Sequence, residues 1–241
     1  MNLIFDFGNT YQKVAVVVEG EIIHLISKYY VDLNTIREIE NQFDFQNVIL
    51  SSVVNHDEVV ESYLSDNYNF IRFSADIPIP LKNDYKTLHS LGSDRLACAV
   101  AAHSLYKEND VFVLQLGTCI TSDFVTKEGV YLGGSISPGL DMRFASLHHF
   151  SAKLPLVEYR DIDFITGNST EESILSGVIN GVAAECNYLI EKYRKKYPFL
   201  KVILTGGNLK KIENTIKAEI VAFPNLVISG LDLILSYNVK K

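Results

Sequence analysis

The sequence predicts an α/β protein made of two related subdomains with a cleft between them. Two segments share one order of elements: an apolar strand, a turn containing glycine, a second strand, another turn and a third strand. These segments are residues 2–26, "NLIFDFGNTYQKVAVVVEGEIIHLI", and residues 110–136, "DVFVLQLGTCITSDFVTKEGVYLGGSI". Because the copies open successive halves of the chain, we expect an internal duplication with subdomains at residues 1–105 and 106–241.

Further elements follow from hydrophobic runs and from residues that favour helix starts. Residues 48–54, "VILSSVV", are typical of a buried strand, and residues 93–106 predict a helix with Ser93 as its N-cap. Residues 201–208, "KVILTGGN", predict a strand that runs into a Gly-Gly turn. The chain closes with a short strand and a helix that we expect to start near Ser229.

The longest predicted helix covers residues 168–197. Ser169 and Glu172 have the spacing of a capping box, and apolar residues then recur at helical intervals. Gly177 and Gly181 lie on this helix, and we interpret them as positions of close packing against a neighbour rather than as functional residues.

Composition limits the class of partner. The chain has 241 residues, of which 47% are hydrophobic, and a net charge of −7, and its Lys/Arg clusters are confined to "YRKKY" and the terminal "KK". This balance disfavours a nucleic-acid partner and favours a small-molecule ligand. Neither a signal-peptide pattern nor an apolar run long enough to cross a bilayer is present, so we expect a cytoplasmic protein without a membrane partner.

The turn of the first copy carries the first candidate site. Asp6 ends a buried strand, and Gly8, Asn9 and Thr10 follow, with Lys13 in the next strand. Gly8 predicts an unusual backbone angle that frees backbone N–H groups, and these groups with Asn9 and Thr10 can cradle phosphate oxygens. Asp6 can hold a hydrated Mg²⁺, and Lys13 adds positive charge. Taken alone, the motif favours a plain hairpin with Asn9 as a turn-forming residue.

The second copy repeats the turn at Gly117 and Thr118. Repetition favours two phosphate-binding hairpins that face a cleft. Just before this turn stands Gln115, a polar amide among strand-forming neighbours. A buried amide requires hydrogen-bond partners, so we expect a polar group or ion beside it.

A third motif is Gly92–Arg95 at the start of a predicted helix. Asp94 lies in the first helical turn, where the helix dipole favours its ionised form, so it can accept a proton from a substrate hydroxyl. Arg95 can pair with an anion. In isolation, this motif favours a helix-stabilising Asp94 and a solvated Arg95. Together with the two hairpins, it favours a site.

Eight segments together resemble the type III pantothenate kinase family. They are "DFGNT", "SSVV", "LGSDR", "LGTCIT", "YLGGSISPGLDM", "AKLPLVE", "GNSTEESILSG" and "TGG", which match in order and spacing across essentially the whole chain. The resemblance implies two RNase H-like subdomains of the actin-like ATPase type and a homodimer. It also implies ATP-dependent phosphorylation of pantothenate to 4′-phosphopantothenate, the first step of coenzyme A synthesis, with Mg²⁺ and a monovalent cation (K⁺ or ammonium).

The resemblance also assigns roles to particular positions. Asp94 corresponds to the proton acceptor, and Asp6 to a position near the metal. The implied ATP-binding residues are Asp6, Gly8, Asn9, Thr10, Lys13 and Thr118, and the implied pantothenate-binding residues are Tyr85, Gly92, Ser93, Arg95 and Thr170. Ser93 replaces the alanine of the family's GADR motif.

Gln115 departs from the family pattern, which has an aspartate that helps to bind the monovalent cation. An amide offers a carbonyl oxygen without charge, so it coordinates K⁺ weakly or replaces the ion with its own NH₂ donor. This departure opens a second hypothesis, a catalytically weak member that binds nucleotide or pantothenate as an accessory or regulatory protein. A third is another kinase of the same superfamily, which Asp94 and Thr170 disfavour.

Overall fold

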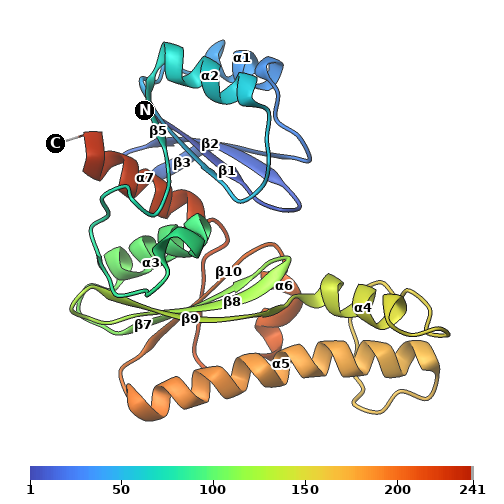
Figure 1. Cartoon of the computed structure of the whole chain (residues 1–241). Coiled ribbons are helices and arrows are strands. Elements are labelled where there is room, and N and C mark those ends of the chain that lie inside the picture. The colour runs from blue at the N-terminus through green and yellow to red at the C-terminus, as the bar shows by residue number, and fades with distance from the viewer. Residues whose placement is uncertain (240–241) are drawn as a thin grey trace. The chain divides into compact units, whose positions relative to one another are not determined.

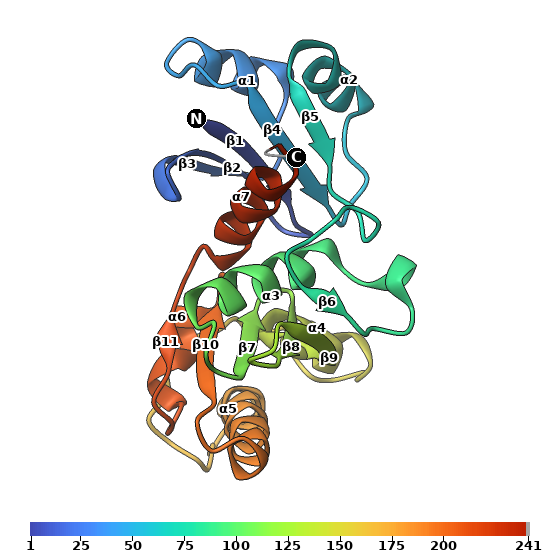
Figure 2. The same cartoon turned by 90° about the vertical axis from the view of Figure 1, so that its left-hand side faces the viewer.

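The structure is a computed structural model that describes residues 1–239, and it divides into two compact units (Figures 1 and 2). Unit 1 contains Met1–Leu105, Gly129–Tyr131 and the segment that begins at Asn225. Unit 2 contains Tyr106–Glu128 and Leu132–Pro224. The last helix therefore groups with unit 1, whereas we expected it in the subdomain of residues 106–241.

Unit 1 is built on a five-stranded sheet in the order β3-β2-β1-β4-β5. The first three strands form the predicted antiparallel meander, and β4 and β5 add to β1 in parallel. The strands are β1 (Asn2–Phe7), β2 (Gln12–Val18), β3 (Glu21–Lys28), β4 (Asn47–Ser52) and β5 (Asn69–Arg72).

Helices cover both faces of this sheet. The helices α1 (Leu33–Glu40) and α2 (Glu58–Asn67) lie on one face (Figure 1), where Phe5, Phe7 and Leu50 enter a buried core with them. The helices α3 (Ser93–Leu105) and α7 (Leu226–Val239) pack on each other and against β1 and β4. A Cβ at Gly230 would lie 1.9 Å from the Ala97 carbonyl oxygen, so only glycine permits this close helix crossing.

Unit 2 repeats the meander in a larger sheet. Its order is β11-β10-β7-β8-β9, and the short β6 (Lys82–Asn83) of unit 1 pairs with Val130 and Tyr131, the first residues of β9. The strands are β7 (Val111–Leu116), β8 (Cys119–Val125), β9 (Val130–Pro138), β10 (Lys201–Thr205) and β11 (Val221–Ala222).

The long helix α5 (Thr170–Lys196) runs along one face of the unit 2 sheet (Figure 1), with α4 (Leu140–His149) beside its N-terminal part. The Ser169 side chain accepts a hydrogen bond from Glu172 N at 3.2 Å, which confirms the predicted N-cap. The Glu172 carboxylate accepts from Asn168 N at 2.9 Å, one residue before the cap. The short helix α6 (Leu209–Ile212) follows β10.

Three expectations differ from the structure. The last helix begins at Leu226 instead of near Ser229, because its first turn is buried and Ser229 N already donates to Asn225 O. Ser93 is the first helical residue of α3 rather than a residue preceding it. A Cβ at Gly177 would meet no atom of the described residues within 4 Å, so the close packing predicted there is not found within the chain.

In the described part of the chain, none of the helices has the length and apolar character needed to cross a membrane.

Candidate active site

The first hairpin places a carboxylate beside a lysine. Asp6 on β1 pairs with Lys13 on β2, and the turn closes with Gly8 N donating to Tyr11 O at 3.0 Å. Gly8 does not adopt the positive φ that we predicted. Its small size matters instead, because a Cβ there would lie 3.2 Å from the Tyr11 oxygen. The tight approach of the two strands therefore explains this glycine.

The Asp6 carboxyl group is electrostatically unfavourable in its ionised form. Burial, and secondly the charge of Asp94, raise its pKa from 3.8 to about 7, while Lys13 partly offsets the shift. The two carboxylates, from β1 and the start of α3, thus lie near each other in unit 1. Two neighbouring carboxylates and one lysine leave an excess of negative charge, which suits a divalent cation.

The second candidate carboxylate is folded against the start of its own helix. Asp94 Oδ1 accepts from Arg95 N at 2.9 Å, and a Cβ at Gly92 would lie 2.6 Å from the same oxygen. Glycine at position 92 thus leaves the space that the Asp94 carboxylate occupies. The first turn of α3 contains Asp94, where the helix dipole stabilises a negative charge.

Arg95 and Tyr85 are brought together. The Arg95 side chain is buried, so it is not the solvated cation of the alternative interpretation, and its Cζ lies 5.8 Å from the centre of the Tyr85 ring. A guanidinium at this distance from a ring face makes a cation–π contact. Unit 1 therefore gathers Asp6, Lys13 and Asp94 with this pair.

In unit 2, two glycines approach the backbone of the second turn. A Cβ at Gly139 would lie 2.4 Å from the carbonyl oxygens of Gly117 and Thr118, and Gly139 N donates to Thr118 O at 3.0 Å. A Cβ at Gly206, which has φ of 100°, would lie 2.5 Å from Leu116 O. Gly139 and Gly206 therefore allow two other segments of unit 2 to pack closely against the backbone of the second turn.

Gln115 is half-buried on β7, opposite Thr121 of β8 and Thr205 of β10. Its neighbours Leu114 and Leu116 enter the core with α5, so the alternation of a strand directs Gln115 to the other face. Thr205 is 1% exposed and Thr121 is 8% exposed. A short row of polar side chains therefore crosses three strands at this level of the sheet.

Thr170 lines an open cavity of about 960 Å³ in unit 2. Polar groups at the start of α5 and Arg143 of α4 contribute to the lining, together with apolar residues such as Leu147 and Ile174. Arg143 is fixed by the carboxylate of Glu185, which also accepts from the Ser137 hydroxyl. The cavity thus lies at the N-terminus of a long helix, beside an arginine whose charge is paired with Glu185.

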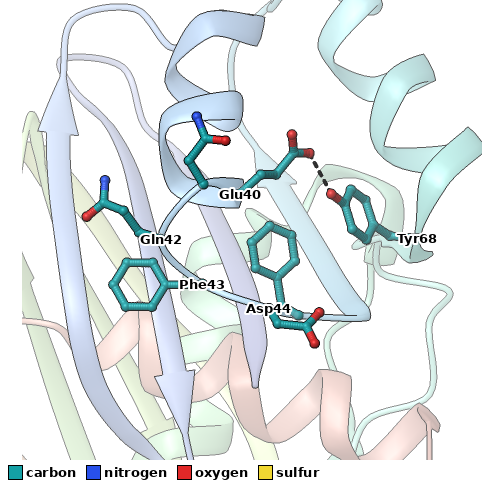
Figure 3. Close-up of a pocket in the computed structure, with 7 residues that line it drawn as sticks. Glu40, Gln42, Phe43, Asp44 and Tyr68 are labelled. Atoms are coloured by element: carbon teal, nitrogen blue, oxygen red, sulfur yellow. Dashed lines mark hydrogen bonds between the residues drawn. The ribbon is translucent and has the colours of Figure 1, made fainter.

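Another pocket of unit 1 contains none of the predicted site residues (Figure 3). It lies at the end of α1, where Tyr68 donates to Glu40 Oε1 at 2.5 Å. Burial and this hydrogen bond raise the pKa of Tyr68, which keeps the phenol protonated. None of the residues that line this pocket belongs to the motifs described above.

Some supporting residues were not identified from the sequence. Gly139 and Gly206 stand in the quoted segments "YLGGSISPGLDM" and "TGG", so a proline- or glycine-rich turn was the available signal. Arg143 and Glu185 are separated by 42 residues. A pair so far apart leaves no local signal in a single sequence.

The fold and the paired glycine-containing hairpins define a class of proteins built from duplicated RNase H-like subdomains. Solved structures share this fold at low sequence identity. They include a putative Baf family transcriptional activator from Campylobacter jejuni (21% identical, TM-score 0.60, covering 99% of this chain and 100% of that one) and a ROK hexokinase from Thermus thermophilus (11% identical, TM-score 0.53, 98% and 99%).

Within this class, the family model for type III pantothenate kinase matches residues 2–192. The chain is 40% identical to the type III pantothenate kinase of Christiangramia forsetii, with 99% of each protein covered, and 39% identical to that of Phocaeicola vulgatus, with both covered in full. This chain belongs to the type III pantothenate kinase family.

Proposed function

We propose that this protein transfers the γ-phosphoryl group of ATP to the primary hydroxyl of pantothenate, giving 4′-phosphopantothenate for coenzyme A synthesis. Family membership over the full length supports the substrate pair. The observation that carries the chemistry is the electrostatic interaction of Asp6 with Asp94, two carboxylates of one unit, which adds to the effect of burial in raising the pKa of Asp6.

Asp94 is the proton acceptor in this proposal. Its carboxylate, placed at the N-terminus of α3, takes the proton of the pantothenate hydroxyl as the bond to phosphorus forms. The buried Arg95 and its partner Tyr85 hold pantothenate beside this base, together with Gly92 and Ser93. Thr170 contacts the substrate from the cavity at the start of α5.

The two hairpins bind the ATP phosphates. In the first, Gly8, Asn9, Thr10 and Lys13 contact the phosphate oxygens, and in the second Thr118 does so. Asp6 holds Mg²⁺, which neutralises phosphate charge during transfer. A divalent cation fits this position because its charge would offset the burial of the Asp6 carboxylate and the nearby charge of Asp94, which together raise the Asp6 pKa.

Position 115 is the site proposed for the monovalent cation. A neutral amide supplies one oxygen ligand and no charge, so the site fits K⁺ or ammonium only weakly. We also propose a homodimer that works in the cytoplasm, where ATP is available. The open cavity along α5 and the exposed side chains of Phe150 and Ile165, 85% and 84% exposed, support a protein partner on unit 2.

Steady-state ADP formation with and without pantothenate tests the function. We expect ADP to form only when pantothenate is present, with one phosphorylated product for each ADP in mass spectrometry. ATP and pantothenate binding without turnover would instead favour the accessory protein that Gln115 suggested. Turnover with another alcohol, and none with pantothenate, would favour a different kinase of the superfamily.

A further inference from the structure

Ser51 lies on the same sheet face as the metal-site carboxylate. In the parallel pairing of β1 with β4, Asp6 is the register partner of Ser51. Phe5 and Phe7 enter the core with α1 and α2, as does Leu50, so Asp6 and Ser51 project to the opposite face, against which α3 and α7 pack. Ser51 is 1% exposed. A hydroxyl buried this completely requires a hydrogen-bond partner.

The partner is Ser93, the residue directly before the proposed base. The hydroxyl oxygens of Ser51 and Ser93 lie 2.7 Å apart, a normal distance for an O–H···O hydrogen bond. The bond joins the end of β4 to the first residue of α3 across 42 positions of sequence. Because Asp6 is the register partner of Ser51 on the neighbouring strand β1, this bond ties the start of α3, which carries Asp94, to the strand beside Asp6.

We propose that Ser51 is a positioning residue for phosphoryl transfer, which acts through Ser93 to hold Asp94 in its reactive place relative to Asp6. This proposal rests on the proposed role of Asp94 as the base. The hydrogen bond between the Ser51 and Ser93 hydroxyls fixes the start of α3, and with it Asp94, to the strand that pairs with β1 at Asp6.

The hydrogen bond between Ser51 and Ser93 depends on a residue in which this chain departs from the GADR motif. Ser93 stands where the motif that the sequence resembles has alanine, which cannot make this contact. The buried serine on β4 and the serine at the helix start therefore act as a matched pair.

The neighbouring Ser52 offers a control on the same strand. Its hydroxyl donates to Val54 O at 2.7 Å and contacts His56 Nδ1 at 3.2 Å, so its bonds stay within its own loop and do not reach α3. Replacement of Ser52 by alanine removes a hydroxyl of the same size without touching the link to the base.

The test compares steady-state kinetics of the variants Ser51→Ala, Ser93→Ala and Ser52→Ala. Loss of one neutral hydrogen bond that aligns the base lowers the rate about 3- to 10-fold. We expect kcat to fall by this factor in Ser51→Ala and in Ser93→Ala. In Ser51→Ala, which removes no proposed substrate contact, KM for ATP and pantothenate stays within about twofold, because alignment matters in the transition state. Ser52→Ala retains the wild-type kcat within about twofold.

The double variant Ser51→Ala/Ser93→Ala separates a shared link from two independent effects. If the hydroxyls act through one bond, kcat of the double variant equals that of the slower single variant. Three outcomes would overturn the proposal. The first is a double variant whose kcat loss is the product of the two single losses, and the second is a kcat loss in Ser52→Ala equal to that in Ser51→Ala. The third is a rise in KM for pantothenate with unchanged kcat in Ser51→Ala. If Ser51→Ala does not fold, Ser93→Ala alone decides, since its side chain is only half-buried.

Asp94→Asn in the same assay separates the positioning role of Ser51 from the role of Asp94 as the base. An inactive Asp94→Asn together with a fully active Ser51→Ala rejects the positioning role and leaves the base assignment intact. A fully active Asp94→Asn rejects the base itself.

Discussion

The negative charge of Asp94 raises the pKa of the Asp6 carboxyl group, so the start of α3 and the end of β1 form one electrostatic unit. Neither residue is strained by its own backbone. The cost arises first from burial of the Asp6 carboxylate and second from the nearby charge of Asp94, as is common where a metal and a transferring phosphoryl group must be held.

This cost predicts a pH-dependent effect of Asp6→Asn on stability. The folded pKa of about 7 exceeds the reference value of 3.8, so the favourable contribution of protonated Asp6 is complete below pH 4 and is lost as pH rises toward 7. Without metal, Asp6→Asn should therefore raise the free energy of unfolding at pH 8, by at most about 4 kcal/mol, and change it little at pH 4. Urea denaturation at both pH values measures this.

Two controls accompany that measurement. Asp66→Asn, on the exposed surface of α2, should leave stability unchanged at both pH values. Added Mg²⁺ should stabilise the wild type and not Asp6→Asn, because a ligand that binds only the folded protein stabilises it. Equal stability of Asp6→Asn and wild type at pH 8 would contradict the raised pKa.

Gly92→Ala should impair catalysis more than folding. The new Cβ would lie 2.6 Å from Asp94 Oδ1, which belongs to the end of a flexible side chain and can move away. Displacement of the base by about 1 Å costs roughly 10- to 100-fold in kcat. The midpoint of thermal unfolding should change by only a few degrees. A fully active Gly92→Ala would show that the observed position of the Asp94 carboxylate is not the reactive one.

Gln115→Asp should strengthen the response of the kinase to K⁺. The wild-type amide contributes no charge, so the cation lacks a strong electrostatic partner and activity should depend weakly on it. The measurement is the kinase rate against KCl concentration, with ionic strength held constant by a bulky organic cation. A steep K⁺ requirement in wild type that Gln115→Asp leaves unchanged would mean that position 115 does not govern the cation.

Light scattering at micromolar concentration tests the homodimer. We expect a mass of about twice the 27.1 kDa of one chain. Gly177→Trp, which fills the open cavity beside α5, should shift the mass toward a monomer if this face is the interface. A wild-type mass of one chain would reject the dimer.

Local patterns sufficed for the duplicated meander, because alternating apolar residues and glycine turns recur within each copy. They sufficed also for α5, whose capping serine lies three residues before Glu172. The helix α1 was missed although Asp32 caps it by accepting from Thr35 N at 2.9 Å. Its spacing in "DLNTIREIE" was an available signal.

The remaining features depend on residues far apart in the chain. The contact of Ser51 with Ser93, and the approach of Gly139 to Thr118, arise from tertiary packing, and no periodicity in one sequence encodes them. The helix α7 joined unit 1 because Gly230 lets it pack closely on α3. Gly8 was expected to need a positive φ, whereas the close approach of Tyr11 O explains it.

The most direct test of the account is the rate at which purified Asp94→Asn phosphorylates pantothenate. The amide keeps the shape of the side chain but cannot accept the proton, so kcat should fall about 10²- to 10⁴-fold. Circular dichroism and ATP binding should match the wild type, which excludes unfolding as the cause. Turnover by Asp94→Asn close to the wild-type rate would contradict the assignment of Asp94 as the catalytic base.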